Sequence, residues 1–280
     1  MKRAAVKPVL VWDIPVRLFH VLLAVGFVTA YSIARFWGEH HPAFVLHMIV
    51  GLTLATLVLA RVVWGFVGTR WARWSTIVHG PAAFADNVGH LFRKGGRHFT
   101  GHNPLSSLGI AAMLGLTLAL AVTGYAIGQG NEALEDVHPV LANLFLIVVV
   151  GHIAGVILHQ IVHGGRLVLG MVDGKKVAPE EDAIRSAAPL GGVLFAALAV
   201  WVGGGMWSNL DPANRTTRVP GVPVTIPLGE REYERSETPR LGASSIDGGK
   251  DGSRGGEDAA RREAHERERD EHGRHREHDD

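Results

Sequence analysis

The sequence predicts an all-α membrane protein: a bundle of four transmembrane helices, a fifth transmembrane helix and a charged, disordered tail. Five apolar segments of 18 residues or more indicate the helices, because a bilayer core of about 30 Å is crossed by about 20 apolar residues. Histidines recur inside these segments. In residues 257–280 every residue is charged or His except three Ala and one Gly, and such a segment cannot form a core.

Composition excludes several classes of function. The 280 residues carry a formal net charge of +1, which gives no reason to expect nucleic acid as a partner. The chain has no cysteine, which excludes disulfides, thiolate-bound iron–sulfur clusters and the covalent attachment of c-type haem. Its 16 histidines leave imidazole as the main candidate metal ligand.

Three spans are expected before residue 128. Residues 18–37 form the first apolar run, which is too long for the core of a typical signal peptide and is therefore expected to be retained. The second span covers residues 43–67. The third covers residues 104–127 and begins with Pro104, because proline suits the first turn of a helix.

The fourth span, residues 139–162, has no charged residue but contains histidines. A fifth, glycine-rich run covers residues 190–207. We therefore divide the chain into a membrane domain (11–176), a fifth helix (189–208) and a Pro-rich linker with a disordered His-rich tail (211–280). The tail either binds metal loosely or is a solvated charge run; its histidines are His265, His272, His275 and His278.

The distribution of Lys and Arg predicts the orientation of the chain. The N-terminus, the loop between spans two and three and the segment after span four are basic, whereas the loops after spans one and three hold little positive charge. By the positive-inside rule the N-terminus is expected in the cytoplasm.

Four intramembrane histidines then fall into two levels. His138 and His152 are fourteen residues apart on span four, which is about 21 Å along one face of a helix. His20 in span one shares the cytoplasmic level of His152, and His47 in span two shares the outer level of His138. The pairs predict two stacked haems b, each iron held by two axial imidazoles from facing helices.

Other residues have candidate roles beside these pairs. Gly51 and Gly155 either allow a macrocycle to approach or serve helix packing. His159 is an alternative to His152 as the inner ligand, or else contacts a propionate or a quinone. Arg61 either pairs with a propionate or is a positive-inside anchor. Because the residue before proline disfavours the α conformation, His138 is expected at the helix cap, ahead of Pro139.

Motifs over residues 11–176 make the chain resemble the bacterial cytochrome b561 family, which includes the b-type cytochrome subunits of nickel–iron hydrogenases. They are V-W-D-x-P-x-R-x-F-H at 11–20, His47 with Gly51, R-x-x-W-G-F-V-G at 61–68, G-H-N-P-L at 101–105, and V-H-x-x-L-A-N and G-H-x-A-G-V in span four. The resemblance implies a four-helix core, two haems b, and His20, His47, His138 and His152 as axial ligands.

The function that follows is electron transfer in a respiratory chain, between the membrane quinone pool and a redox partner such as a hydrogenase, a dehydrogenase or a c-type cytochrome. The chain would be an electron-transfer subunit in the lipid bilayer of a bacterial inner membrane, where it could form a homodimer, rather than a self-contained enzyme. The alternative is a metal or proton transporter that uses intramembrane histidines. It predicts sites near the bilayer midplane and inverted repeats, whereas these histidines gather towards the two faces.

Overall fold

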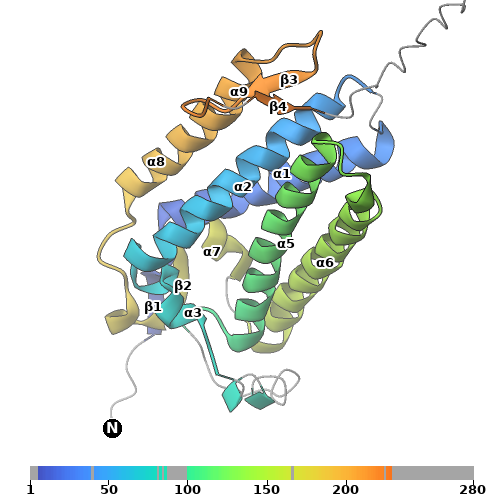
Figure 1. Ribbon diagram of the computed structural model, residues 1–280. Coiled ribbons are helices and arrows are strands. Elements are labelled where there is room, and N and C mark those ends of the chain that lie inside the picture. The colour runs from blue at the N-terminus through green and yellow to red at the C-terminus, as the bar shows by residue number, and fades with distance from the viewer. Residues whose placement is uncertain are drawn as a thin grey trace, which may run out of the picture. The chain divides into compact units, whose positions relative to one another are not determined.

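Five long apolar helices dominate the computed structural model (Figure 1), as the sequence predicts. Four of them are α1 (Ile14–Phe36), α2 (Phe44–Val67), α5 (Pro104–Gly128) and α6 (Val137–His163). The fifth is made of α8 (Pro189–Ala199), the π-helical segment η4 (Val200–Gly204) and α9 (Gly205–Ser208). The structure describes residues 6–38, 41–80, 82–83, 85–86, 100–164, 167–223 and 225–228. The predicted charged tail lies outside this range.

Short elements connect the long helices. Four are single turns or little more: η1 (Arg70–Ala72), α3 (Trp74–Ile77), η2 (Glu132–Leu134) and η3 (Glu180–Asp182). The helix α7 (Leu167–Asp173) follows α6. Two antiparallel strand pairs complete the described part: β1 (Val6–Leu10) with β2 (Lys175–Pro179), and β3 (Thr216–Arg218) with β4 (Thr225–Pro227).

The starts of α1 and α5 are specified by the same local chemistry. Asp13 caps α1 by accepting a hydrogen bond from the amide of Val16 at 2.9 Å, and Asn103 caps α5 by accepting one from Ser106 at 2.7 Å. A proline stands in the first turn of each helix, where its missing amide proton would have no partner within the helix.

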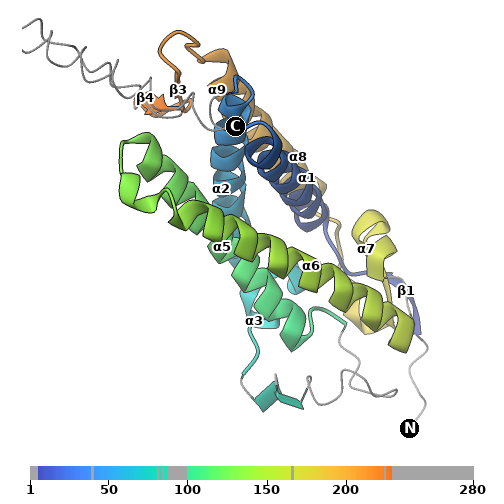
Figure 2. The same cartoon turned by 90° about the vertical axis from the view of Figure 1, so that its right-hand side faces the viewer.

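The helices pack in the order α1–α2–α5–α6, each against the next. Leu57 and Val58 of α2 are almost fully buried between α1, α5 and α8. The fifth helix lies along α1 and α2 (Figure 1), on the far side of them from α6 (Figure 2). It approaches closely at Gly191, where an added Cβ would lie 2.6 Å from the ring of Trp64.

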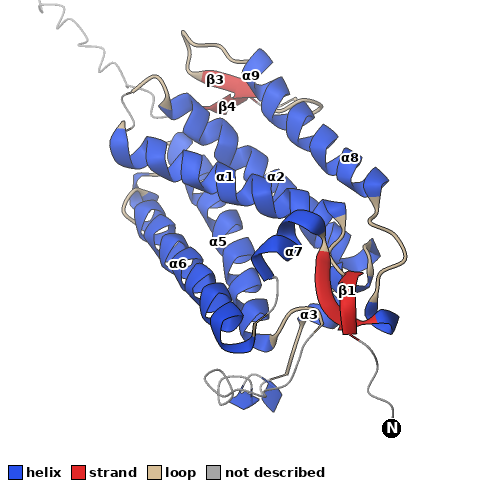
Figure 3. Cartoon of the chain, turned by 180° about the vertical axis from the view of Figure 1, so that it is seen from behind, coloured by secondary structure: helices blue, strands red, loops and turns tan. Residues whose placement is uncertain are grey.

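The two strand pairs lie at opposite ends of the bundle (Figure 3). We call these the β1–β2 end and the β3–β4 end. The strand β1 follows the N-terminal residues, which the sequence marks only as basic and interfacial. Its partner β2 comes more than 160 residues later. Part of the predicted Pro-rich linker, from Asp211 to Leu228, folds back as the second strand pair.

The expectation that His138 stands at the helix cap is wrong. Asp136 is the N-cap of α6 and Val137 is its first residue, so His138 lies inside the first turn. Proline at position 139 is tolerated there because the first amides of a helix have no acceptor within it. The helix therefore fixes the backbone of His138 directly.

Candidate functional site

Two pairs of histidine rings face each other between α6 and the helices α1 and α2. The rings of His20 and His152 have centroids 6.5 Å apart and an interplanar angle of 55°. The rings of His47 and His138 have centroids 6.2 Å apart and an angle of 69°. The first pair lies towards the β1–β2 end and the second towards the β3–β4 end. The structure thus brings together the residues that the sequence groups by depth.

The ring separations suit one metal ion within each pair. An imidazole nitrogen binds such an ion at about 2 Å, so two imidazoles on opposite sides of it have centroids about 6 Å apart. Direct hydrogen bonding between the two rings would instead need nitrogen atoms about 3 Å apart. Both observed separations therefore suit a metal ion held between the two imidazoles of a pair.

Aromatic side chains fill the space between the two levels. Phe145 is seven residues from both His138 and His152 on α6, and Phe27 is seven residues after His20 on α1. Their rings stack with centroids 4.2 Å apart, and both are buried. Beyond them, the Tyr31 hydroxyl donates to Asn143 Oδ1 at 2.8 Å. This packing separates the two histidine pairs with apolar side chains.

Hydrogen bonds orient both rings of the His47–His138 pair. His47 Nδ1 lies 2.8 Å from the carbonyl oxygen of Ala30, so Nδ1 carries the proton. His138 Nδ1 lies 2.8 Å from Thr123 Oγ1, and that hydroxyl donates to the carbonyl of Ala119 at 2.9 Å. His138 Nδ1 therefore also donates. In each ring Nε2 is left with its lone pair, which is the state of a metal-ligating imidazole.

A largely apolar pocket of about 270 Å³ surrounds this pair. Both rings line it, together with Gly51, Gly124 and the rings of Phe27 and Phe145. Arg35, from the last turn of α1, lies at its wall. A concave apolar site with a few polar groups is typical of cofactor binding.

The glycines keep side chains out of this space. A Cβ on Gly51 would meet nothing within 4 Å, and the same holds for Gly155 beside His152. A Cβ on Gly124 would lie 3.2 Å from His138 Cε1, so a larger residue would press against that ring. A planar macrocycle has room beside Gly51 and Gly155, which is one of the two roles the sequence leaves open.

Arg61 is buried at the β1–β2 end, with 3% of its surface exposed. Its Nη2 donates to the carbonyl of Ala72 at 3.1 Å, and its guanidinium stands over the ring of Trp74 at 5.2 Å. Its Nη1 is buried with no hydrogen-bond partner among the described residues. Arg61 is therefore held inside the protein, and the position does not suit an interfacial anchor that reaches water.

Asp13 joins the first two helices at this end. Besides capping α1, its carboxylate accepts from Trp64 Nε1 at 3.0 Å and from Thr69 Oγ1 at 2.7 Å. Asp13 is 1% exposed. The V-W-D and W-G-F-V-G motifs thus meet in one buried hydrogen-bonded joint between α1 and α2.

His102 is a half-buried residue whose position sequence reasoning missed. Its ring packs on Trp12 with centroids 4.6 Å apart, and its Nε2 is buried without a hydrogen-bond partner in the described part of the chain. Burial, together with the smaller effects of the nearby charges of Arg61, Lys176 and His152, lowers the pKa of His102 to about 3. The imidazole is therefore neutral at physiological pH.

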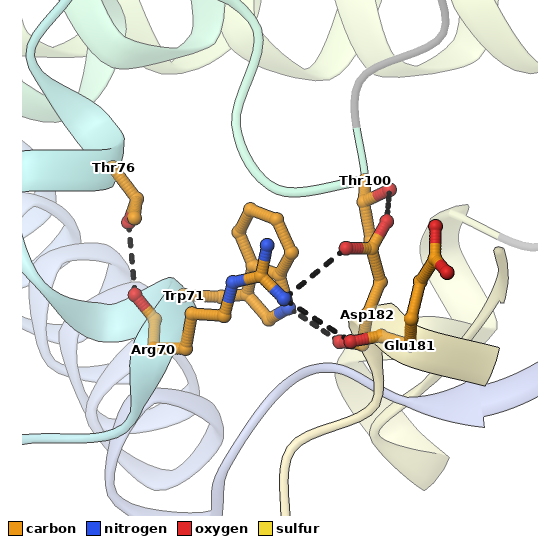
Figure 4. A network of polar contacts seen from close by, with 6 residues as sticks. All are labelled: Arg70, Trp71, Thr76, Thr100, Glu181 and Asp182. Atoms are coloured by element: carbon orange, nitrogen blue, oxygen red, sulfur yellow. Dashed lines mark hydrogen bonds and ion pairs between the residues drawn. The ribbon is translucent and has the colours of Figure 1, made fainter. Parts of the chain in front are cut away.

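A polar network holds the segment that carries His102 (Figure 4). Asp182 accepts from Thr100 Oγ1 at 2.6 Å and pairs with Arg70 at 3.2 Å, while its carbonyl accepts from Trp71 Nε1 at 2.8 Å. Gly101 is required here, because a Cβ would lie 2.5 Å from the Trp71 ring. The G-H-N-P motif thus places His102 between a close-packed glycine and the cap of α5.

The remaining histidines lie away from these pairs or outside the described residues. His159 is half-buried on α6, two turns beyond His152. His79 contacts the carbonyl of Ile77 and the hydroxyl of Ser107, and His41 contacts the amide of Ala43. His40, His90, His98 and the four tail histidines are not among the described residues.

No group of three or more His, Cys, Asp or Glu that would hold a metal ion occurs among the described residues. Zinc-type sites need three or four protein ligands, whereas each histidine pair offers two.

Comparison with known proteins identifies relatives of the four-helix core. Residues 11–174 match the model of the family described as prokaryotic cytochrome b561. A protein of Bradyrhizobium diazoefficiens, named probable Ni/Fe-hydrogenase B-type cytochrome subunit, is 28% identical over 165 residues, covering 47% of this chain and 64% of that protein. One of the same name from Rhizobium leguminosarum bv. viciae is 27% identical over 157 residues, covering 45% and 64%. No solved structure matches significantly. The fifth helix lies beyond the matched residues.

Proposed function

The chain belongs to the prokaryotic cytochrome b561 family, and on that premise we propose that it transfers electrons across the bilayer through two bis-histidine haems b. The observation that carries this proposal is the pair of ring separations, 6.5 Å and 6.2 Å, at two levels of one membrane bundle. Haem b, when bound, supplies reversible one-electron chemistry. The protein supplies the iron ligands, sets the distance between the two histidine pairs, excludes water from them and places charged side chains nearby.

Each pair has a defined role in this proposal. His20 and His152 hold the inner haem iron, and His47 and His138 hold the outer one. The contact between His20 and His152 supports His152 over His159 as the inner ligand. His159 and Arg61 remain at the inner level as contacts for a propionate or a quinone. Gly51 and Gly155 leave space for the ring systems.

The protein environment fixes the two sites and keeps water away from them. Ala30 and Thr123 set the tautomers of the outer pair, which raises the basicity of the ligating nitrogen and holds the ring angle. The stacked rings of Phe27 and Phe145 occupy the space between the levels. An apolar, close-packed layer of this kind excludes water between two redox sites.

We place the β1–β2 end in the cytoplasm of a bacterial cell, with the protein in the inner membrane. The basic loop residues at this end include Lys7, Arg73, Lys175 and Arg185, and short cytoplasmic loops carry an excess of Lys and Arg. The outer haem then faces the side where periplasmic redox proteins dock.

The partners follow from the relatives. Two similar proteins are named as probable subunits of Ni/Fe-hydrogenase, so a hydrogenase is the first candidate partner, with a dehydrogenase or a c-type cytochrome as alternatives. We propose the membrane quinone pool as the other partner. The chain covers 64% of the length of each relative.

A quinone exchange assay tests this function. Purified protein in detergent is mixed anaerobically with a short-chain quinol, and the dithionite-reduced protein is mixed with the matching quinone. We expect b-type absorbance bands to appear in the first experiment or to fade in the second. His152→Ala serves as the control, because it should remove the response of one haem. Haems that react with neither quinol nor quinone would contradict the quinone link.

A further inference from the structure

Two buried nitrogen atoms at the β1–β2 end lack acceptors or donors among the described residues: Arg61 Nη1 and His102 Nε2. An unsatisfied polar atom in the interior costs about 1–3 kcal/mol, and more if it belongs to a charged group. Native proteins leave few such atoms without a partner. Their presence indicates a ligand that is bound in the working protein.

The charges around these atoms indicate an anion. Asp13 is the one buried carboxylate among the described residues. Its charge acts on Arg61, but its oxygens already accept from Val16, Trp64 and Thr69. Neither of the ion pairs found in the described part of the chain involves Arg61. Lys176 brings a second cation, with its Nζ 3.3 Å from the carbonyl of Gly101, next to His102. The guanidinium of Arg61 and the ammonium of Lys176 thus both act electrostatically on the imidazole of His102.

These groups lie at the level of the His20–His152 pair. Arg61 follows His47 by fourteen residues on α2, and His152 follows His138 by the same number on α6. Each interval is about 21 Å of helix, so Arg61 reaches the inner level as His152 does. His102 is near enough to both Arg61 and His152 for their charges to act on it.

We propose that Arg61, His102 and Lys176 form a carboxylate-binding pocket that takes a propionate of the inner haem. The proposal rests on the proposed function, because it needs a haem at His20 and His152. Arg61 presents its free Nη1 to the carboxylate, Lys176 adds a second positive charge, and His102 donates through Nε2. The sequence suggested Arg61 and His159 for such a contact; the structure adds His102 and Lys176 beside Arg61.

Redox titration of single variants tests the pocket. We expect Arg61→Gln to lower one of the two midpoint potentials by about 59 mV, equivalent to a tenfold change in a one-electron equilibrium. The sign is negative because removal of a cation favours the more positive, oxidised iron. Lys176→Gln should shift the same potential in the same direction. The affected potential should be the one that disappears in His20→Ala.

Matched controls separate the pocket from a general loss of positive charge. Arg185→Gln and Lys175→Gln each remove one exposed cation from the same end of the bundle, and both should leave the two potentials unchanged. Arg61→Lys retains the charge, so it keeps the potential near the native value. This variant also keeps the test usable if Arg61→Gln does not fold.

A chemical probe identifies the carboxylate itself. Membranes from a host that cannot make haem are loaded with haem or with haem dimethyl ester, whose propionates carry no charge. The inner site of the native protein should prefer haem, and Arg61→Gln should reduce this preference about tenfold. Native protein with two haems whose potentials and ester preference do not respond to Arg61→Gln or Lys176→Gln would overturn the pocket alone. Native protein without haem would overturn the proposed function and the pocket together.

Discussion

Alanine in place of His20, His47, His138 or His152 is expected to remove about one haem from each chain. Bis-histidine ligation gives each iron two protein bonds, and loss of one leaves the haem with a single ligand in a cavity built for two. The pairing also predicts which haem is lost. His20→Ala and His152→Ala should lose the same haem, and His47→Ala and His138→Ala should lose the other one. The measurement is the haem content per chain by the pyridine haemochrome method, with redox titration to identify which haem is lost.

Two further variants complete this experiment. His41→Ala should retain both haems, because His41 lies in the loop between α1 and α2, where its Nδ1 accepts from the amide of Ala43 and its ring lies beside Trp37. His159→Ala should also retain both haems. Loss of one haem in His159→Ala, with His152→Ala silent, would reverse the choice of inner ligand. Loss of the same haem in His20→Ala and His47→Ala would refute the pairing by depth.

Asp13→Ala is expected to be the most destabilising substitution outside the histidine pairs. Three donors lose their buried acceptor: the amide of Val16, Trp64 Nε1 and Thr69 Oγ1. At about 1–3 kcal/mol for each unsatisfied donor, the expected loss is at least about 3 kcal/mol. We expect a lower midpoint of thermal unfolding in detergent. The change in haem absorbance with temperature measures this midpoint.

A second helix cap provides the matched control. Asp136 is the N-cap of α6, but it is exposed and its side chain makes no capping hydrogen bond. Asp136→Ala should therefore change stability by about 0.5 kcal/mol or less. Asp13→Asn keeps an acceptor for the helix cap and should fall between the two. Equal unfolding midpoints for Asp13→Ala and Asp136→Ala would refute the importance of the joint.

The helices could be predicted from the sequence because bilayer length and apolarity act locally. All five expected spans are present, and their ends differ from the prediction by a few residues. The proximity of His20 to His152 followed from helix rise and from the order of the spans. Spacing alone, however, says nothing about ring orientation. The carbonyl of Ala30 and the hydroxyl of Thr123, which set the tautomers, come from neighbouring helices and carry no sequence signal of their own.

The features that sequence reasoning missed depend on contacts between distant parts of the chain. β1 pairs with residues more than 160 positions away, and no local pattern specifies such a partner. His102 stands beside a polar segment, which made it resemble a loop residue, yet Trp12 and Trp71 bury the segment that carries it. Only the G-H-N-P motif marked that position. The cap of α6 was misplaced because the rule for residues before proline is weaker within the first turn of a helix.

The haem content of the native protein tests whether the chain holds two haems b. Protein purified in mild detergent is assayed for haem by pyridine haemochrome and for chain concentration by amino-acid analysis. We expect two haems b per chain, with reduced-minus-oxidised bands of the b type and two separable midpoint potentials. A chain that holds no haem, or only one at full occupancy, would contradict it.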